Sequence, residues 1–136
     1  MLTMVYNSYR KFKIWGYTVS HSSLLIRSVM KFTDEDGFSK DTSYNIDVEF
    51  WAVTYINAPT FLEGIKIIEI SKNDLPENIN RELCKYNQKV FEIHEGDNKY
   101  YIIAGGLLVG INRWEKEDRI FNYDLDLKHD EVIAKS

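Results

Sequence analysis

The chain has 136 residues, of which 44% are hydrophobic and 14% aromatic, enough for the core of one compact domain. Its formal net charge of −4 argues against a nucleic-acid partner, because phosphate binding requires a surplus of Lys and Arg on one face. The single cysteine, Cys84, cannot form an internal disulfide, and no run approaches the roughly 18 apolar residues of a membrane span. We therefore expect a single soluble domain over residues 1–136, in the cytoplasm and with no membrane partner.

The N-terminal part of the chain predicts a hairpin and a loop. Apolar and polar residues alternate over residues 11–19 and again over residues 24–32, which is typical of strands, and a polar turn at residues 20–23 separates them. Residues 33–42 are charged and short of apolar side chains, so we expect an exposed loop there. Residues 1–9 are weakly patterned and predict no element.

The middle of the chain predicts the central strand of a sheet, over residues 44–56. Its first half alternates apolar residues with Asn45, Asp47 and Glu49, which predicts one buried and one solvated face. From Trp51 onward both faces are apolar or amphipathic, so the strand must run inward or be covered. After a break around Pro59, residues 65–70 predict a second strand that could pair antiparallel with the first.

The segment after residue 70 predicts the one helix of the chain, over residues 75–87. Asp74 is followed three residues later by Glu77, with Pro76 between them, which is typical of a capped helix start. Four apolar residues then recur at helical spacing: Leu75, Ile79, Leu83 and Tyr86.

The C-terminal part returns to strands. Residues 90–94 and 100–104 predict a hairpin, residues 107–111 a further strand, and residues 122–136 a docking segment or a disordered tail. The order is four strands, one helix and three strands. We therefore predict an α+β domain, mainly an antiparallel twisted sheet or a partly closed barrel, with the helix over residues 75–87 packed on one side.

The sequence offers weak signals for catalysis and none for a cofactor. His21 lies among serines that could act as nucleophiles, although hydroxyls in a turn ordinarily bond the backbone. Three widely spaced histidines predict no metal site, and the glycines lack the order of a phosphate-binding loop. Asp47 and Glu49, about 7 Å apart on one strand face, suit either acid–base chemistry or a surface charge ladder, and we favour the ladder.

Aromatic residues indicate binding instead. Large amphipathic rings dominate protein interfaces. Beside Asp47 and Glu49, the rings of Trp51, Tyr55 and Trp114 would form an acidic, aromatic docking surface for a basic protein partner. This interpretation predicts a non-enzymatic protein-binding module, monomeric or homodimeric.

The alternative is a small ligand-binding or hydrolytic β-barrel domain. In that hypothesis His21, Asp47 and Glu49 surround an interior cleft. A histidine meeting a carboxylate in a deep pocket would favour it over the binding module.

Two stretches also suggest a family type: residues 21–27, reading HSSLLIR, and residues 45–56, which contain NIDVEF and VTYI. They resemble the hairpin and central strand of small uncharacterised bacterial β-rich proteins, some of which are grouped with immunity proteins of polymorphic toxin systems. The resemblance covers the first half of the chain and carries no catalytic motif. It implies a cytoplasmic monomer or dimer that works by binding another protein.

Overall fold

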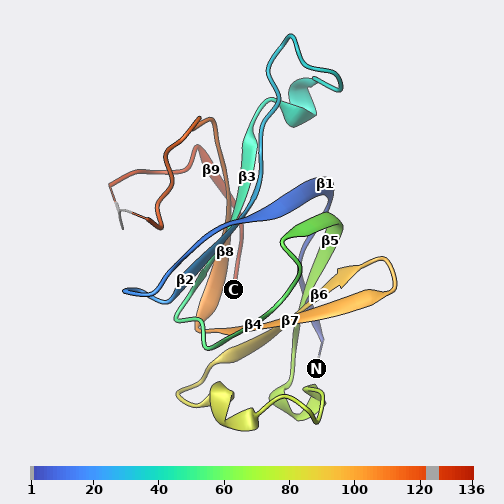
Figure 1. Cartoon of the computed structure of the whole chain (residues 1–136), viewed down its shortest axis with the longest axis vertical. Coiled ribbons are helices and arrows are strands. Elements are labelled where there is room, and N and C mark those ends of the chain that lie inside the picture. The colour runs from blue at the N-terminus through green and yellow to red at the C-terminus, as the bar shows by residue number, and fades with distance from the viewer. Residues whose placement is uncertain (1, 122–125) are drawn as a thin grey trace.

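Antiparallel strands make up nearly all of the regular structure (Figure 1). The structure, a computed structural model, describes residues 2–121 and 126–136. In these residues the strands are β1 (Thr3–Thr18), β2 (Ser23–Ser28), β3 (Asn45–Trp51), β4 (Tyr55–Asn57), β5 (Phe61–Ile70), β6 (Lys89–Glu95), β7 (Asn98–Ala104), β8 (Gly106–Asn112) and β9 (Glu131–Lys135). Short 3₁₀ turns occur at Lys40–Thr42, Lys72–Asp74 and Arg81–Cys84. None of the described residues form a helix with the length and apolarity that a membrane crossing requires.

The strands form one sheet that closes on itself. Their order is β4-β7-β6-β5-β1-β2-β3-β8-β9, with every neighbour antiparallel. Residues 52–54 join β3 to β4, and Gly105 alone joins β7 to β8. The β3–β8 and β4–β7 pairs are therefore two parts of one bent antiparallel pair. Because β4 and β7 lie at one end of the strand order and β3 and β8 lie near the other end, this bent pair closes the sheet. The bend lies where Ala52 has a φ of 51° and the amide of Gly105 donates to the Trp51 carbonyl.

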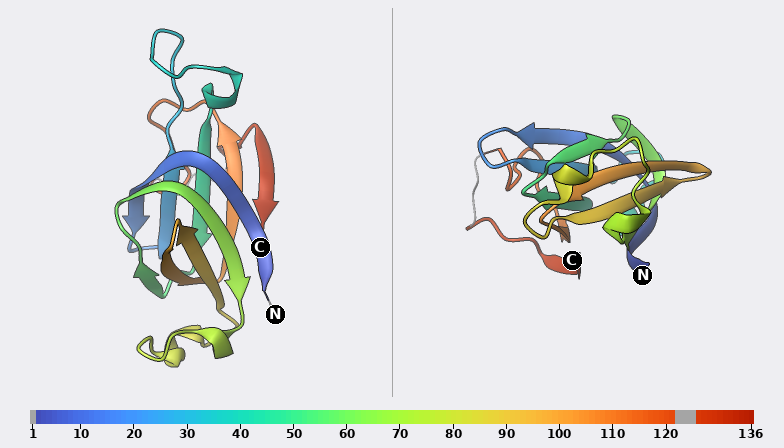
Figure 2. Two further views of the ribbon diagram at one scale, coloured as in Figure 1. Left: turned by 90° about the vertical axis from the view of Figure 1, so that its right-hand side faces the viewer. Right: turned by 90° about the horizontal axis from the view of Figure 1, so that it is seen from below.

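The long strand β1 belongs to both halves of the sheet. Its C-terminal part pairs with β2 from Lys13 to Thr18, and its N-terminal part pairs with β5 from Thr3 to Lys13. Register shifts along β1, one of them at Gly16, allow the curvature that this double pairing requires. In Figure 2, β1 and β5 accordingly curve across the layer formed by β2, β3, β8 and β9.

The main core fills the interior of the closed sheet. It takes apolar residues from seven strands, and the rings of Phe50 on β3 and Phe91 on β6 meet edge to face at 5.7 Å. The alternation expected for β3 holds on this side, because Ile46, Val48 and Phe50 all point into the core.

Two segments cover the outer faces of the sheet. Residues 71–88, here called the apolar cover, place Leu75, Ile79 and Cys84 on the outward residues of β5, β6 and β7. Residues 113–121 and 126–130, here called the polar cover, lie over β2, β3 and β8 and bond their outward polar side chains.

The antiparallel sheet is confirmed, but the α+β class and the helix over residues 75–87 are wrong. The segment holds only 3₁₀ turns, because Ser71 and Asn80 each accept an amide within their own short turn and Pro76 has no amide to extend a helix. Tyr86 and Asn87 then take positive φ values of 62° and 65°.

Other boundaries also differ from the predicted ones. The central strand expected over residues 44–56 breaks at Ala52 into β3 and β4, because that residue lies in the left-handed region. Residues 3–9, given no element from the sequence, belong to β1. The tail over residues 122–136 contains β9, and its first residues, 122–125, lie outside the described part of the chain.

Candidate functional site

The carboxylates predicted to face solvent on the central strand are buried. Asp47 and Glu49 are 0% and 6% exposed, because the polar cover lies over the outer face of β3. The alternation of residues along a strand shows which side chains share a face, but it does not show whether that face is exposed to solvent. The expected solvent-exposed acidic surface is therefore corrected to an enclosed polar layer.

Asp47 is held by a buried arginine. Arg27 on β2 donates from Nε to Oδ1 at 2.6 Å and from Nη2 to Oδ2 at 2.8 Å, a two-pronged ion pair. Asn112 on β8 donates to the same Oδ2 at 2.9 Å. Nη2 of Arg27 also donates to the Glu117 carbonyl at 3.0 Å, which ties the polar cover to the sheet.

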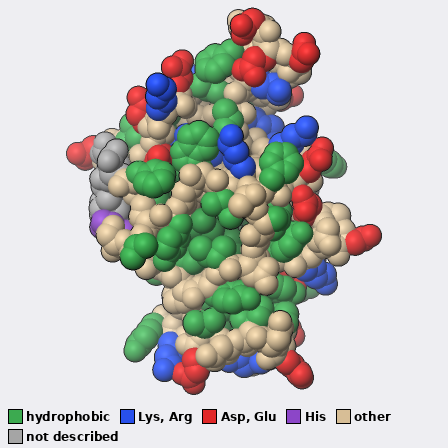
Figure 3. Space-filling view, in the orientation of Figure 1, with side chains coloured by type: hydrophobic (Ala, Val, Ile, Leu, Met, Phe, Trp, Pro, Cys, Tyr) green, Lys and Arg blue, Asp and Glu red, His purple; other side chains and the backbone are tan. Residues whose placement is uncertain are grey.

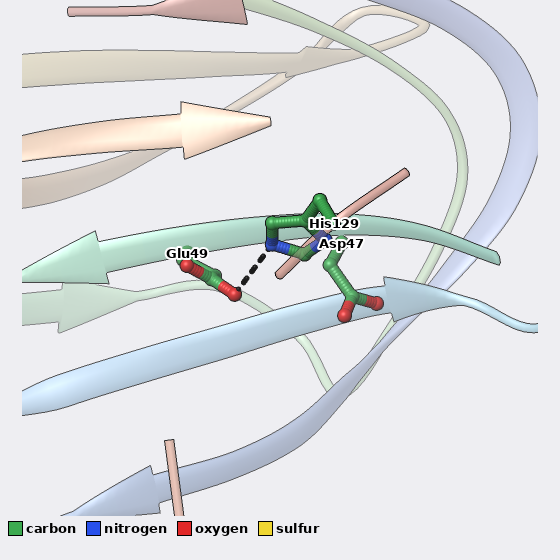
Figure 4. A group of neighbouring side chains, drawn as sticks. All are labelled: Asp47, Glu49 and His129. Atoms are coloured by element: carbon green, nitrogen blue, oxygen red, sulfur yellow. Dashed lines mark hydrogen bonds and ion pairs between the residues drawn. The ribbon is translucent and has the colours of Figure 1, made fainter. Parts of the chain in front are cut away.

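Glu49 is held by a histidine from the distant end of the chain. His129 Nε2 lies 2.8 Å from Glu49 Oε2, as the dashed line in Figure 4 shows, and Arg119 Nη1 lies 3.4 Å from Oε1. The imidazole stacks on Trp114 with 5.0 Å between ring centres. It also lies against Gly110, where an added Cβ would come within 2.3 Å of His129 Cγ, so this place requires a glycine.

The arrangement of Asp47, Glu49 and His129 also has the donor types of a metal centre. One ligand atom from each lies within 4.8 Å of the others, and nitrogen with carboxylate oxygens is a set that zinc accepts. Both carboxylates, however, already face arginines, so a cation would have to displace Arg27 or Arg119 from them. The arrangement fits a neutralised structural network better than an open metal site.

The structure does not bring His21 to the carboxylates. It lies in the turn between β1 and β2, with Nδ1 2.9 Å from the hydroxyl of Ser20, whereas the residues opposite Asp47 and Glu49 on β2 are Arg27 and Leu25. His129 takes the place beside Glu49. Its only sequence signal is a histidine in a charged tail, and the contact spans 80 positions.

Of the aromatic residues expected to flank the carboxylates, Trp114 adjoins Glu49 through the His129 ring on which it stacks, and Trp51 lies two residues from Glu49 on the same face of β3. Trp51 is 38% exposed and packs on Gly106, Tyr55 is half-buried against the apolar cover, and Trp114 is half-buried within the polar cover. Because Asp47 and Glu49 are buried, these rings do not form the expected exposed surface with the carboxylates.

A second polar cluster lies on the outer face of β6 and β7. Tyr101 donates to Glu92 Oε2 at 2.9 Å, and His94 Nε2 lies beside Oε1 of the same carboxylate. Burial and the hydrogen bond to Glu92 raise the pKa of Tyr101 to about 12. For Glu92, burial pushes the pKa upward, but the bonds from His94 and Tyr101 together hold it below its usual range.

A large groove opens between β1 and the layer of β2, β3, β8 and β9. Its volume is about 790 Å³. Apolar lining comes from β1, β3, β8 and β9, and includes Phe12, Ile46, Ile111 and Ile133. Aromatic and basic lining comes mainly from β1 and the residues flanking β2 and β3, and includes Tyr6, Tyr9, Arg10, Lys13, Lys31 and Tyr44. The space-filling view shows Lys and Arg side chains above a broad hydrophobic area on one face of the molecule (Figure 3).

Arg10 on β1 bridges the groove to residues at the end of β2 and before β3. Its Nε donates to the Ser28 hydroxyl at 3.0 Å, Nη1 to the Asp41 carbonyl at 2.9 Å and Nη2 to the Tyr44 carbonyl at 2.7 Å. The guanidinium lies 5.2 Å from the centre of the Tyr44 ring. Burial lowers the pKa of Arg10 and raises that of the neighbouring Tyr6, so this part of the groove is poorly solvated.

The comparisons with known proteins give no relative to guide the interpretation. No family model, curated protein or solved structure matches the chain.

Proposed function

We propose that this chain is a non-enzymatic binding protein of the cytoplasm, and that the groove beside β1 holds a small organic ligand. The observation that carries the proposal is the concave volume of about 790 Å³ with its apolar floor. Ligand sites generally occupy about 300–1,000 Å³ and combine apolar walls with a few polar groups. The groove has both features.

The chemistry of the groove supports binding rather than catalysis. No histidine or cysteine is among the described residues that line it. The histidine–carboxylate contact that a hydrolytic site would use is instead buried under the polar cover, with Glu49 also facing Arg119. His21 lies in the turn before β2, away from both buried carboxylates. The hydrolytic form of the alternative has no geometric support here.

A second candidate is the protein-binding function expected from the resemblance to immunity proteins. The observation that favours it is β9, which pairs only with β8 among the described strands and exposes 51% of Val132 and 36% of Ile133. A partner could add a strand to such an edge. The expectation of a basic partner loses its original support, because Asp47 and Glu49, whose charges suggested it, are buried.

Fluorescence of N-phenyl-1-naphthylamine, an apolar uncharged probe that brightens in dry sites, tests the first candidate. Ile133 lines the groove and Val132, next to it on β9, does not. We expect wild type and Val132→Trp to bind the probe, and Ile133→Trp to fill the space and weaken binding by about tenfold. Circular dichroism must show that both variants are folded. Equal probe binding by all three proteins, or none by wild type, would contradict a ligand site in the groove.

A further inference from the structure

The inner side of the groove carries a cation, Arg10 on β1. Its guanidinium lies 5.2 Å from the centre of the Tyr44 ring, which packs against the main core. It also donates to the hydroxyl of Ser28, the register partner of the core residue Ile46. Phe12, two residues further along β1, is itself part of the core. Arg10 therefore reaches the groove on the same side of the sheet as the apolar floor.

Arg10 is held in place without being neutralised. Four hydrogen bonds fix its guanidinium, and every acceptor is uncharged: the hydroxyl of Ser28 and the carbonyls of Ser28, Asp41 and Tyr44. Arg10 forms no salt bridge with any described residue. Since a guanidinium has five N–H groups, its bonds to the described residues leave one N–H of Nη1 to donate. A fixed donor whose charge has no counter-ion is prepared for an anion from outside the chain.

The surroundings of Arg10 favour such an anion. Burial lowers the pKa of Arg10, and the charges that act on it come from Tyr44 and Tyr6 rather than from a carboxylate. Tyrosine hydroxyls ordinarily carry no charge at neutral pH. A cation that is partly removed from water and lacks a counter-charge is unfavourable, and an anion in the groove would offset that cost.

Next to Arg10 the lining of the groove is apolar. Phe12, Ile46 and Ile111 all line it, and Ile46 and Ile111 share the inner face as register partners on β3 and β8. From these observations we infer that the ligand of the groove is an amphipathic carboxylate, whose charged end lies at Nη1 of Arg10 and whose apolar body lies on these three residues. Charge complementarity selects this occupant over an uncharged apolar molecule. The inference rests on the proposed function, since it names the ligand of that groove.

Competition against bound N-phenyl-1-naphthylamine tests the inference separately. Dodecanoate, dodecanol and dodecylammonium share one apolar chain and differ in the charge of the end group. We expect dodecanoate to displace the probe at about tenfold lower concentration than dodecanol at low salt, and dodecylammonium to be the weakest competitor. Equal displacement by dodecanoate and either of the others, or displacement by none, would overturn the inference while leaving the groove a binding site. Failure of the probe itself to bind wild type would overturn both.

Variants at Arg10 locate the charged end. Arg10→Gln removes the charge but keeps an amide donor, so it should remove most of the advantage of dodecanoate and leave dodecanol unchanged, whereas Arg10→Lys should retain part of that advantage. The matched control is Lys11→Gln, because Lys11 is the next residue of β1 but its side chain is 69% exposed and faces Glu63. An undiminished dodecanoate advantage in folded Arg10→Gln, or its loss in Lys11→Gln, would overturn the proposed position.

A measurement on wild type keeps the position testable if Arg10→Gln fails to fold. In nuclear Overhauser spectra, the protons next to the carboxylate of bound dodecanoate should contact the rings of Tyr6 and Tyr44, which lie around the guanidinium of Arg10. Contacts of these protons with neither ring would overturn the proposed position.

Discussion

The two segments that cover the sheet differ in what they bury. The apolar cover packs Leu75 and Ile79, 3% and 4% exposed, onto aliphatic residues of β5, β6 and β7. The polar cover encloses charges, with Arg27 on Asp47 and His129 on Glu49. Burial of apolar surface is non-directional and tolerates imperfect fit, whereas an enclosed ionic network stabilises only when every member has its partner. Mutations in the two covers should therefore destabilise the fold in different ways.

Breaking the ion pair of the polar cover should have the largest effect. Asp47→Leu leaves the Arg27 guanidinium buried without a counter-charge, and we expect a loss of about 3–5 kcal/mol in the free energy of unfolding, measured with urea. Arg27→Met combined with Asp47→Leu should recover most of that loss, since no unpaired charge remains. A double variant as unstable as the single one would show that packing, not charge, holds this cover.

Truncation in the apolar cover should be the next largest. Ile79→Ala removes a side chain that is 4% exposed and should lower the free energy of unfolding by about 2–4 kcal/mol. The loss should be the same at low and high salt, because no charge is involved. Tyr86→Ala, in the same segment but 92% exposed, is the matched control and should change little. A salt-dependent loss of stability for Ile79→Ala would contradict the proposed difference between the two covers.

A smaller effect should follow from crowding His129. Gly110→Ala places a Cβ 2.3 Å from His129 Cγ, which must move the imidazole away from Glu49 and cost about 1–3 kcal/mol. In a His129→Ala background the same change should be nearly neutral, so a double-mutant cycle in urea isolates the contact. Equal losses in both backgrounds would mean that Gly110 is needed for a reason other than the ring.

The smallest effect concerns Tyr101, which packs beside the apolar cover but bonds Glu92. Its pKa of about 12 lies above the ordinary 10.0, so its contribution to stability is complete below pH 10 and is lost as pH rises through 12. Tyr101→Phe should therefore be less stable than wild type near neutral pH, and the difference in melting temperature should vanish at high pH. Tyr9→Phe, at a position 96% exposed, should show no difference at either pH. A constant gap for Tyr101→Phe would contradict the assignment.

The contrast between the covers also explains which sequence predictions were correct. The spacing of Leu75 and Ile79 predicts their burial correctly, but the helix predicted from the same spacing is wrong, because the residues lie in 3₁₀ turns and irregular backbone. Local turns capped by Ser71 and Asn80 satisfy the amides without a helix. Apolar spacing thus reports contact with a core more safely than it reports backbone geometry.

The buried polar network could not be predicted from the sequence, for a different reason. Alternation on β3 correctly placed Asp47 and Glu49 on one face, and polar residues on such a face ordinarily meet water. Their partners Asn112 and His129 lie 65 and 80 positions away, and no local pattern links them. The groove likewise forms because β1 pairs with β2 along its C-terminal part and with β5 along its N-terminal part. Hydrophobic periodicity alone does not specify this change of pairing partner.

The double pairing of β1 sets the order in which the chain can assemble. Its C-terminal part pairs with β2 across a short turn. Its N-terminal part can pair only after β5 is available, since Thr3 pairs with Glu69. Distant pairings of this kind slow folding, typically to milliseconds or longer, because a long loop must close before the contacts form. Until then the first residues of β1 are an open strand edge that can pair with a neighbouring molecule. We expect refolding yield to fall with protein concentration, and synthesis beyond residue 70 to be needed before the N-terminus is protected.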